Sequence, residues 1–339
     1  VSPACETPLL ARDITAALAG NGPTLGFGEV SSEFGPSQAA VVIGTSGTTG
    51  APKEIFLSSH ALVASARASN AFVGAKLGDT WSLLLPLTHV AAVNVFVRAF
   101  ELGTIPVDLR NHSGEYPRVN FTAIVPTQLF RALNGDDQLL KHLQGAQKVL
   151  VGGAALSSAI RNQATAAGIN VVTTYGMSET SGGCVYNGEI LEGAEVEVRG
   201  GSIFIRGSVL ALNLELSDGW FETNDLGEFV DEKLVVIGRS DDVIISGGEN
   251  LSLNSVENIL SQSFPESQFA AFSVEDPQWG QTLHIAVVGE ADSGSISSVL
   301  EEKVGAFAKP KGIHSLNSLP LLGIGKVDRK RLAQEIPNE

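Results

Sequence analysis

Apolar and polar positions follow two different rhythms along the chain. From residue 39 to about residue 175, short apolar runs alternate with segments of helical periodicity. Strands that alternate with helices indicate crossover connections and a mostly parallel sheet. The pattern predicts one helix at 8–18 and strands at 39–43, 81–85, 123–125, 148–151 and 170–173.

The rhythm changes after residue 185. Short runs at 195–199, 202–206 and 233–237 alternate apolar with polar positions between Gly and Asp turns, which predicts a small antiparallel β-barrel or sandwich at about 185–238. The last hundred residues return to a mixed pattern. It predicts helices at 254–261 and 296–308 and strands at 269–274 and 283–288. The predicted fold class is α/β, with an N-terminal domain at 1–239 and a small α+β C-terminal domain at 240–339.

Composition narrows the range of partners. The chain of 339 residues has a net charge of −15, which argues against nucleic acid or an anionic membrane surface as a partner. Its two cysteines, Cys5 and Cys184, have no metal-site spacing and favour a reducing, cytoplasmic location. The start of the chain has no basic stretch followed by an apolar core, so no signal peptide is expected.

The most apolar segment, residues 83–100, is not expected to span a membrane. It contains Pro86, His89, Asn94 and Arg98. A lone spanning helix tolerates such residues only at high cost. We therefore predict a buried strand and a turn that leads into a helix.

The segment 44–53 carries the strongest chemical signal. It reads Gly-Thr-Ser-Gly-Thr-Thr-Gly-Ala-Pro-Lys and follows an apolar strand. Its glycines allow backbone N–H groups to approach an anion, its hydroxyls add donors, and Lys53 adds a cation. It is not a Walker A loop, in which Lys and then Ser or Thr follow the second glycine directly. A flexible linker is the alternative interpretation.

Four further segments carry candidate chemistry, and three of them have a simpler structural explanation. Glu179, in a Tyr-Gly-Met-Ser-Glu segment after a strand, either binds a divalent cation or is a solvated turn residue. Asp225 either binds a ribose or caps a turn. A Gly-Arg-Ser-Asp segment lies at 238–241, and Lys326, in Gly-Lys-Val-Asp-Arg, is otherwise a solvated tail residue.

Together and in this order, the five segments resemble the motifs of the adenylate-forming superfamily, which includes acyl- and aryl-CoA ligases, luciferases and peptide-synthetase adenylation domains. Residues 45–53 fit every position of that family's phosphate loop, and residues 175–179, 238–241 and 325–329 fit its later motifs. The usual Thr-Gly-Asp appears as Thr-Asn-Asp at 223–225. The resemblance covers about residues 39–335 and implies an ATP-dependent, AMP-forming enzyme with Mg²⁺.

The resemblance also implies roles for individual residues. Glu179 would hold Mg²⁺, Lys326 would contact the acid and the α-phosphate, and Asp241 would be the hinge of a mobile C-terminal domain. The implied ATP-binding residues are Thr45, Ser46, Gly47, Thr48, Thr49, Gly50, Lys53, Gly153, Ala154, Ala155, Tyr175, Gly176, Met177, Ser178, Asp225 and Arg239.

Two features resemble the o-succinylbenzoate–CoA ligase branch of menaquinone synthesis: the region before the phosphate loop is short, and residues 86–98 are similar to that branch's His…Arg stretch. That branch implies a small carboxylate and coenzyme A as substrates, with His89 facing the acyl pocket and Arg98 pairing with the succinyl carboxylate. His89 and Arg98 would face opposite sides of one continuous helix, so both can face the acyl pocket only if the helix starts after His89. Further pocket candidates are Thr127, Gln128, Gly152, Gly153, Ser181, Gly182 and Gly183.

Three alternatives stay open. His89 is a core histidine if it does not face substrate. Within the superfamily, the chain is a ligase for another aryl or acyl acid, or an adenylation enzyme that feeds a separate carrier protein. Outside it, the chain is a nucleotide-binding scaffold, although Glu179 and Lys326 are both present. A homodimer is possible.

Overall fold

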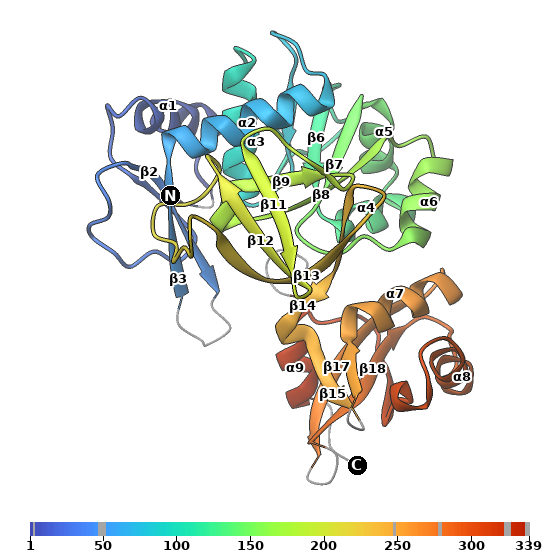
Figure 1. Cartoon of the computed structure of the whole chain (residues 1–339). Helices are drawn as coiled ribbons and strands as arrows, with labels where there is room; N and C mark the ends of the chain where they lie inside the picture. Colours follow the sequence, from blue (N-terminus) through green and yellow to red (C-terminus); the bar gives the residue numbers. More distant parts are fainter. Residues whose placement is uncertain (3, 47–51, 247–248, 277–279, 322–326, 336–339) are drawn as a thin grey trace.

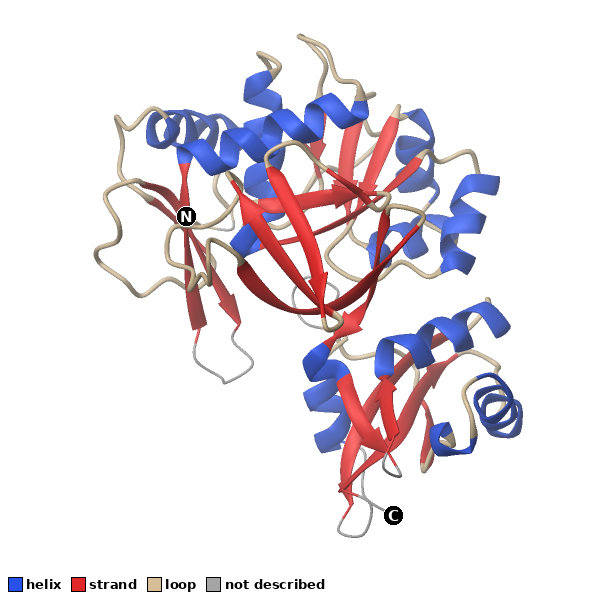
Figure 2. Ribbon diagram, viewed as in Figure 1, coloured by secondary structure: helices blue, strands red, loops and turns tan. Residues whose placement is uncertain are grey.

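The computed structural model describes residues 1–2, 4–46, 52–246, 249–276, 280–321 and 327–335, without the side chains of Ser46, Pro52 and Asp241. The chain forms a large upper body of sheets and helices and a smaller lower lobe that begins after β14 (Figure 1). Helices flank the sheets of the upper body and of the lobe (Figure 2). None of the helices in the described ranges has the length and apolar character needed to cross a membrane.

The first sheet is built around a hairpin. Strand β1 pairs in parallel with β2, and β2 pairs antiparallel with β3. Residues 47–51 join the two strands of the hairpin and lie outside the described residues. The elements of this part are α1 (Thr7–Leu18), β1 (Leu25–Phe27), β2 (Ala39–Ser46), β3 (Pro52–Ser58) and α2 (Ser59–Val73).

The second sheet has seven strands in the order β10-β9-β8-β7-β6-β4-β5. From β8 to β5 all neighbours are parallel, whereas β9 and β10 are antiparallel additions. Its elements are β4 (Trp81–Leu83), α3 (Val90–Glu101), β5 (Val107–Asp108), β6 (Phe121–Ile124), α4 (Pro126–Leu133), α5 (Asp137–Gly145), β7 (Lys148–Val151), α6 (Ser158–Ala166), β8 (Val171–Met177), the 3₁₀ turn η1 (Ser178–Thr180), β9 (Gly182–Tyr186) and β10 (Glu189–Ile190). This arrangement confirms the predicted mostly parallel sheet.

Two smaller layers complete the molecule. A four-stranded antiparallel sheet has the order β11-β12-β13-β14. The lower lobe contains a β15–β16 hairpin and a three-stranded β17-β18-β19 sheet. The elements are β11 (Ala194–Arg199), β12 (Ser202–Gly207), β13 (Phe221–Val230), β14 (Lys233–Arg239), η2 (Ser240–Asp242), β15 (Val243–Ser246), β16 (Glu249–Ser252), α7 (Leu253–Ser263), β17 (Gln268–Asp276), β18 (Gly280–Val288), α8 (Ser293–Lys303), η3 (Ala306–Ala308), β19 (Gly312–Ser315) and α9 (Arg329–Glu335).

The buried side chains fall into separate cores. One contains helices α2 and α3 and their flanking strands, and includes Trp81, Phe96 and Tyr186. A second lies beneath α4, α5 and α6. The lower lobe has its own core, centred on Val256 and Ile285, on the sheet face that packs against α7 and α8.

The predicted elements match the structure with one clear correction. The strand predicted at 148–151 is β7 itself, and most other boundaries move by one to four residues. The helix predicted at 296–308 is wrong over its last third, because α8 ends at Lys303 and only the short η3 follows. Gly305 has a φ of 130° between the two. A side chain rarely adopts that conformation, so glycine breaks the helix here.

Candidate active site

The predicted phosphate loop spans the β2–β3 hairpin. Thr45 and Lys53 face each other across the hairpin, and the Thr45 hydroxyl donates to the Lys53 carbonyl at 2.9 Å. The predicted residues Gly47, Thr48, Thr49 and Gly50 lie outside the described residues. A Walker A loop instead leads from a strand into a helix. The β2–β3 hairpin therefore agrees with the prediction from sequence that this segment is not a Walker A loop.

Lys53 is brought against the second motif of the chain. Its Nζ lies 3.5 Å from Glu179 Oε1, although the two residues are 126 positions apart. The Lys53 side chain is about half exposed, whereas Glu179 is largely covered. This contact places a cation and a carboxylate side by side, next to the phosphate loop.

Glu179 is presented by the end of the parallel sheet. It lies in η1, the 3₁₀ turn that directly follows β8, and its carbonyl accepts from the Ala211 backbone N–H at 2.9 Å. No group of three or more His, Cys, Asp and Glu side chains is positioned to hold a metal within the described ranges. One carboxylate nevertheless suits Mg²⁺, which protein sites commonly bind through one or two carboxylates together with substrate phosphates.

A second contact joins three of the predicted ATP-binding residues. The Tyr175 hydroxyl donates to Asp225 Oδ2 at 2.8 Å, and Arg239 Nη1 lies 3.6 Å from Asp225 Oδ1. Burial, followed by the charge of Asp225, raises the pKa of Tyr175, so its hydroxyl stays protonated and keeps donating. Strands β13 and β14 place Asp225 directly opposite Arg239. The residue before Asp225 is Asn224, where the family usually has glycine. Asp225 itself still takes part in this network.

Glycines allow close packing at the ends of two neighbouring strands. A Cβ on Gly152, just after β7, would lie 2.1 Å from Thr174 Oγ1. A Cβ on Gly176, within β8, would lie 2.0 Å from the Gly182 carbonyl oxygen. The Thr174 side chain beside Gly152 and the backbone of Gly182 beside Gly176 lie too close for any side chain at these two positions. Gly153, Ala154 and Ala155 follow β7, and Met177 ends β8, so these predicted adenine-wall segments lie at the carboxyl ends of adjacent parallel strands.

His89 stands at the start of α3. It is the residue before the first turn, with an extended backbone, and its Nδ1 lies 2.7 Å from the Thr88 hydroxyl. The helix therefore starts after His89, as is required for His89 and Arg98 to face the same pocket. The two residues are still about 13 Å apart along the helix axis, from nine steps of about 1.5 Å. Thr127 lies in the first turn of α4, which follows β6. The Gln128 side chain accepts a hydrogen bond from Val125 N and donates one to the Leu84 carbonyl, so it links these two backbone groups.

Arg98 points into the buried layer between α3, α2 and β9. It is 4% exposed, its Nη2 donates to the Tyr186 hydroxyl at 3.0 Å, and its guanidinium lies 5.0 Å from the Trp81 ring centroid. No carboxylate of the described part of the chain forms an ion pair with it, and its Nε has no hydrogen-bond partner there. A buried cation without an acid is costly. An acidic group beside the Arg98 guanidinium would offset this desolvation cost.

Asn94 and Ser181 extend the same buried layer. Asn94, one helical turn before Arg98, is 1% exposed, and its Nδ2 donates to the Ser181 carbonyl at 2.8 Å. Within the described residues, Asn94 Oδ1 and Ser181 Oγ are buried without a partner, as is Arg98 Nε. We call Asn94, Arg98 and Ser181 the buried polar seam. Sequence reasoning named Arg98 and Ser181 but gave no role to Asn94.

Arg329 links two motifs of the lower lobe. Its guanidinium bonds to Glu257 at 2.9 Å and to Asn254 at 3.0 Å, and lies 3.5 Å from Asp242. The arginine of the closing motif is thus fixed to the residue after Asp241. Lys326 and the Asp241 side chain lie outside the described residues. The links of Arg329 were not predicted, because a motif match does not show which carboxylates surround an arginine.

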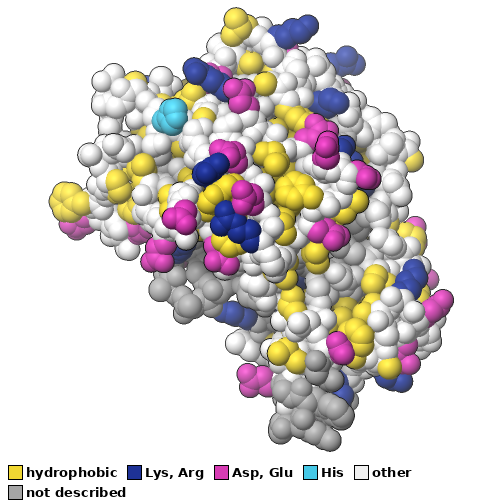
Figure 3. Space-filling view, in the orientation of Figure 1, with side chains coloured by type: hydrophobic (Ala, Val, Ile, Leu, Met, Phe, Trp, Pro, Cys, Tyr) yellow, Lys and Arg dark blue, Asp and Glu magenta, His cyan; other side chains and the backbone are white. Residues whose placement is uncertain are grey.

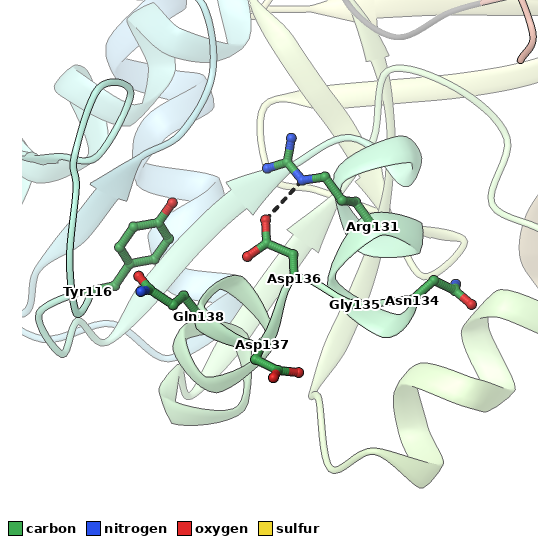
Figure 4. A pocket seen from close by; sticks show the side chains of 7 residues that line it. All are labelled: Tyr116, Arg131, Asn134, Gly135, Asp136, Asp137 and Gln138. Carbon is green, nitrogen blue, oxygen red and sulfur yellow. Dashed lines mark hydrogen bonds and ion pairs between the residues drawn. The ribbon is translucent and has the colours of Figure 1, made fainter.

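Two surface features complete the description. A shallow hollow of about 600 Å³ lies at the α4–α5 turn, with Arg131 paired to Asp136 on one side and Tyr116 on the other (Figure 4). None of the predicted site residues lines it. Over the described part of the face in Figure 3, acidic and basic side chains are interspersed. An anionic substrate would therefore have to be bound by individual Lys and Arg side chains at its site.

A hairpin loop with a lysine, a carboxylate at a strand end, and a Tyr–Asp–Arg network beside it are features of a nucleotide-dependent, adenylate-forming enzyme. Residues 8–206 match the AMP-binding enzyme family, and the chain belongs to that family. It is 37% identical to the probable 2-succinylbenzoate–CoA ligase of Mycobacterium tuberculosis strain H37Rv, over 88% of this chain and 85% of that protein.

Solved structures share the fold. The o-succinylbenzoate CoA synthetase (MenE) of Bacillus subtilis, in complex with the acyl-adenylate OSB-AMP, has a TM-score of 0.76 at 22% identity, covering 97% of this chain and 82% of that one. ATP-bound MatB of Rhodopseudomonas palustris has a TM-score of 0.77 at 21% identity, covering 90% and 70%. At these identities the likeness concerns the fold.

Proposed function

We propose that the protein is an AMP-forming carboxylate–CoA ligase that converts o-succinylbenzoate to its CoA thioester through an acyl-adenylate. The contact between Lys53 and Glu179 carries the ligase proposal, because it joins the phosphate loop to the predicted metal-binding carboxylate. The 2-succinylbenzoate–CoA ligase relative at 37% identity supports the choice of acid. A ligase or adenylation enzyme for another aryl or acyl acid is the second candidate.

ATP would lie along the carboxyl ends of β7 and β8. Lys53 and the hairpin loop would hold the β- and γ-phosphates. Asp225 and Arg239 would hold the ribose, and Tyr175 would orient Asp225 through its hydroxyl. The segments 153–155 after β7 and 175–177 in β8 would line the adenine ring.

The first chemical step joins two anions. A carboxylate oxygen of the acid attacks the α-phosphorus of ATP, a P–O bond forms, and pyrophosphate leaves. Glu179 would hold Mg²⁺, which neutralises phosphate charge when bound. Lys326 would offset the remaining repulsion between the acid and the α-phosphate. In the second step the sulfur of coenzyme A attacks the acyl carbon, AMP leaves, and the thiol proton is released.

The change between the two steps requires Lys326 to withdraw. We propose that residues 240–339 form a mobile domain that turns about Asp241, while residues 1–239, with a small β-barrel at about 185–238, hold ATP and the acid. Arg329 supports this proposal, because it fixes the segment that follows Lys326 to Asp242, beside the hinge. Coenzyme A would enter as the domain turns.

We also propose that the protein is a homodimer and that it is located in the cytoplasm.

Arg98 would recognise the second carboxylate of the acid, the one that is not activated. Its buried guanidinium has no acid partner within the described residues, and a carboxylate would supply one. His89, Thr127, Gly152, Gly153 and Ser181 would line the path between this carboxylate and the α-phosphate. The seam's donors, Arg98 Nε and Ser181 Oγ, suit an anion or a water that contacts it.

Pyrophosphate release with a panel of acids tests the proposal. We expect release with o-succinylbenzoate and ATP–Mg²⁺, and a CoA thioester by mass spectrometry when coenzyme A is added. Release without a thioester indicates an enzyme that serves a carrier protein. Release with monocarboxylic acids alone contradicts the choice of acid, and absence of acid-dependent release contradicts the ligase.

A further inference from the structure

Asn94 is a buried amide on an otherwise apolar stretch of α3. Its neighbours Val93, Val95 and Phe96 are apolar and buried. A buried amide costs free energy unless it finds partners. The Nδ2 group finds one in the Ser181 carbonyl at 2.8 Å, whereas Oδ1 has none within the described residues. Packing alone would favour an apolar residue at this position.

The turn that receives Asn94 is shaped around it. Ser181 has a φ of 52° and Gly182 a φ of 102°, both in the left-handed region that side chains disfavour. A Cβ on Gly182 would lie 1.9 Å from Asn94 Nδ2. Position 182 therefore has no room for a side chain, because the Asn94 amide occupies that space. A strained turn persists only where its surroundings hold it.

Asn94 lies between residues of two different ends of the site. Ser181 directly follows η1, the turn that carries Glu179. Arg98 lies one helical turn beyond Asn94 and faces the same buried layer. The hydrogen bond from Asn94 to Ser181 thus connects the helix of the acid-binding arginine to the turn of the metal-binding carboxylate.

We propose that Asn94 is a positioning residue that sets the acid relative to the triphosphate. The proposal rests on the proposed function, in which Arg98 binds the second carboxylate and Glu179 binds Mg²⁺ and phosphate. Asn94 holds Arg98 and Glu179 at a fixed separation, and thereby places the activated carboxylate within reach of the α-phosphorus. A shift of about 1 Å in such an alignment lowers a rate about 100-fold.

The test compares Asn94→Leu and Asn94→Val with Ser65→Ala. Leucine keeps the branching of asparagine and removes the donor, and valine removes the same donor with a shorter side chain; neither places a new charge beside Arg98. Ser65 on α2 is the matched control, because it is also buried without a partner for its hydroxyl within the described part, and its removal leaves the bond to Ser181 in place.

Adenylation is followed by pyrophosphate release with o-succinylbenzoate, and binding is measured by calorimetry. We expect both Asn94 variants to lower kcat for adenylation about 10- to 100-fold. The separate Kd values of o-succinylbenzoate and of α,β-methylene-ATP should change less than about threefold, while the gain in acid affinity when the nucleotide is present is lost. Ser65→Ala should behave like the wild type.

Other outcomes overturn the inference. A variant that keeps the wild-type kcat shows that Asn94 is dispensable for positioning. If one variant does not fold, the other decides. Equal loss of affinity for acid and nucleotide, with a lower Tm, assigns Asn94 a structural role only. If the wild type itself releases no pyrophosphate with o-succinylbenzoate, the proposed function fails first, and the two failures are distinguishable.

Discussion

The nucleotide end and the acid end of the site are built in opposite ways. At the nucleotide end, Lys53 meets Glu179 and Arg239 meets Asp225, so opposite charges are paired and the basic partner of each pair is partly exposed. At the acid end, Arg98 is buried without an acid partner within the described part of the chain. A paired site is stable before its ligand arrives, whereas an unpaired buried cation is stabilised by the ligand. The second arrangement suits selection between acids.

The largest expected effect is that of Lys326→Ala, which acts where the two ends meet. We expect a loss of about 10²–10³-fold in adenylation, because the lysine stabilises charge in that transition state. Thioester formation from supplied acyl-adenylate should be nearly unchanged. Single-turnover measurements of each half-reaction check this. Equal slowing of both would contradict the role assigned to Lys326.

Arg98→Met tests the acid end directly. The KM for o-succinylbenzoate should rise about 10- to 100-fold, from the loss of a charged hydrogen bond, and the KM for benzoate-like monoacids should be unchanged. The Tm should be unchanged or higher, because a buried charge is replaced by an apolar side chain. A lower Tm with an equal loss for both acids would make Arg98 structural.

Tyr175→Phe tests the nucleotide end with a smaller change. It removes the hydroxyl that donates to Asp225 but leaves Arg239 in place. We expect the KM for ATP to rise about fivefold, the scale of one hydrogen bond. The KM for the acid should stay constant in the same steady-state assays, and a larger effect on the acid would show that the two ends are not separate.

The smallest effect concerns Glu54, beside Lys53. Hydrogen bonds from the Ser32 hydroxyl and from the backbone and hydroxyl of Ser31 lower the pKa of Glu54 to about 2. The folded state therefore gains stability from ionised Glu54 above about pH 4.5, and loses it as the pH falls toward 2.

Urea unfolding of the wild type and Glu54→Gln across this pH range measures the effect. The difference in free energy of unfolding between the two proteins should shrink as the pH falls. It should be small throughout, because Glu54 is largely solvated and its interactions are screened. A difference that stays constant with pH would mean that the carboxylate has no special stabilisation.

The sequence predicted features of the fold that follow from local patterns of apolar residues. It missed a feature that depends on the backbone conformation adopted in the folded chain. The parallel strands β4, β6, β7 and β8 and the helices α1 and α7 were predicted by range, because apolar periodicity reflects burial of one face. Helices α2, α4, α5, α6 and α9 were not. The error in α8 came from Gly305, whose effect depends on the conformation that the chain adopts there. A helical pattern by itself does not show where a helix ends.

The site divides in the same way. Motifs identified Lys53, Glu179, Tyr175, Asp225 and Arg239, because nucleotide chemistry requires particular residue types at particular spacings. The role of Asn94 was missed. Its spacing of four from Arg98 was a usable signal, since residues at that spacing share a helix face. What the spacing could not give was the partner, Ser181, which lies 87 positions later.

The sequence by itself determined the family, the predicted chemistry and the strand-and-helix pattern, since these depend on residue types and short spacings. Only the tertiary structure decided which charges are paired. Whether Lys53 has Glu179 beside it, and whether Arg98 lacks any acid within the described residues, depends on contacts between segments far apart in the chain. Coulomb energies and desolvation act over a few ångströms of space, and positions along the chain do not report those distances.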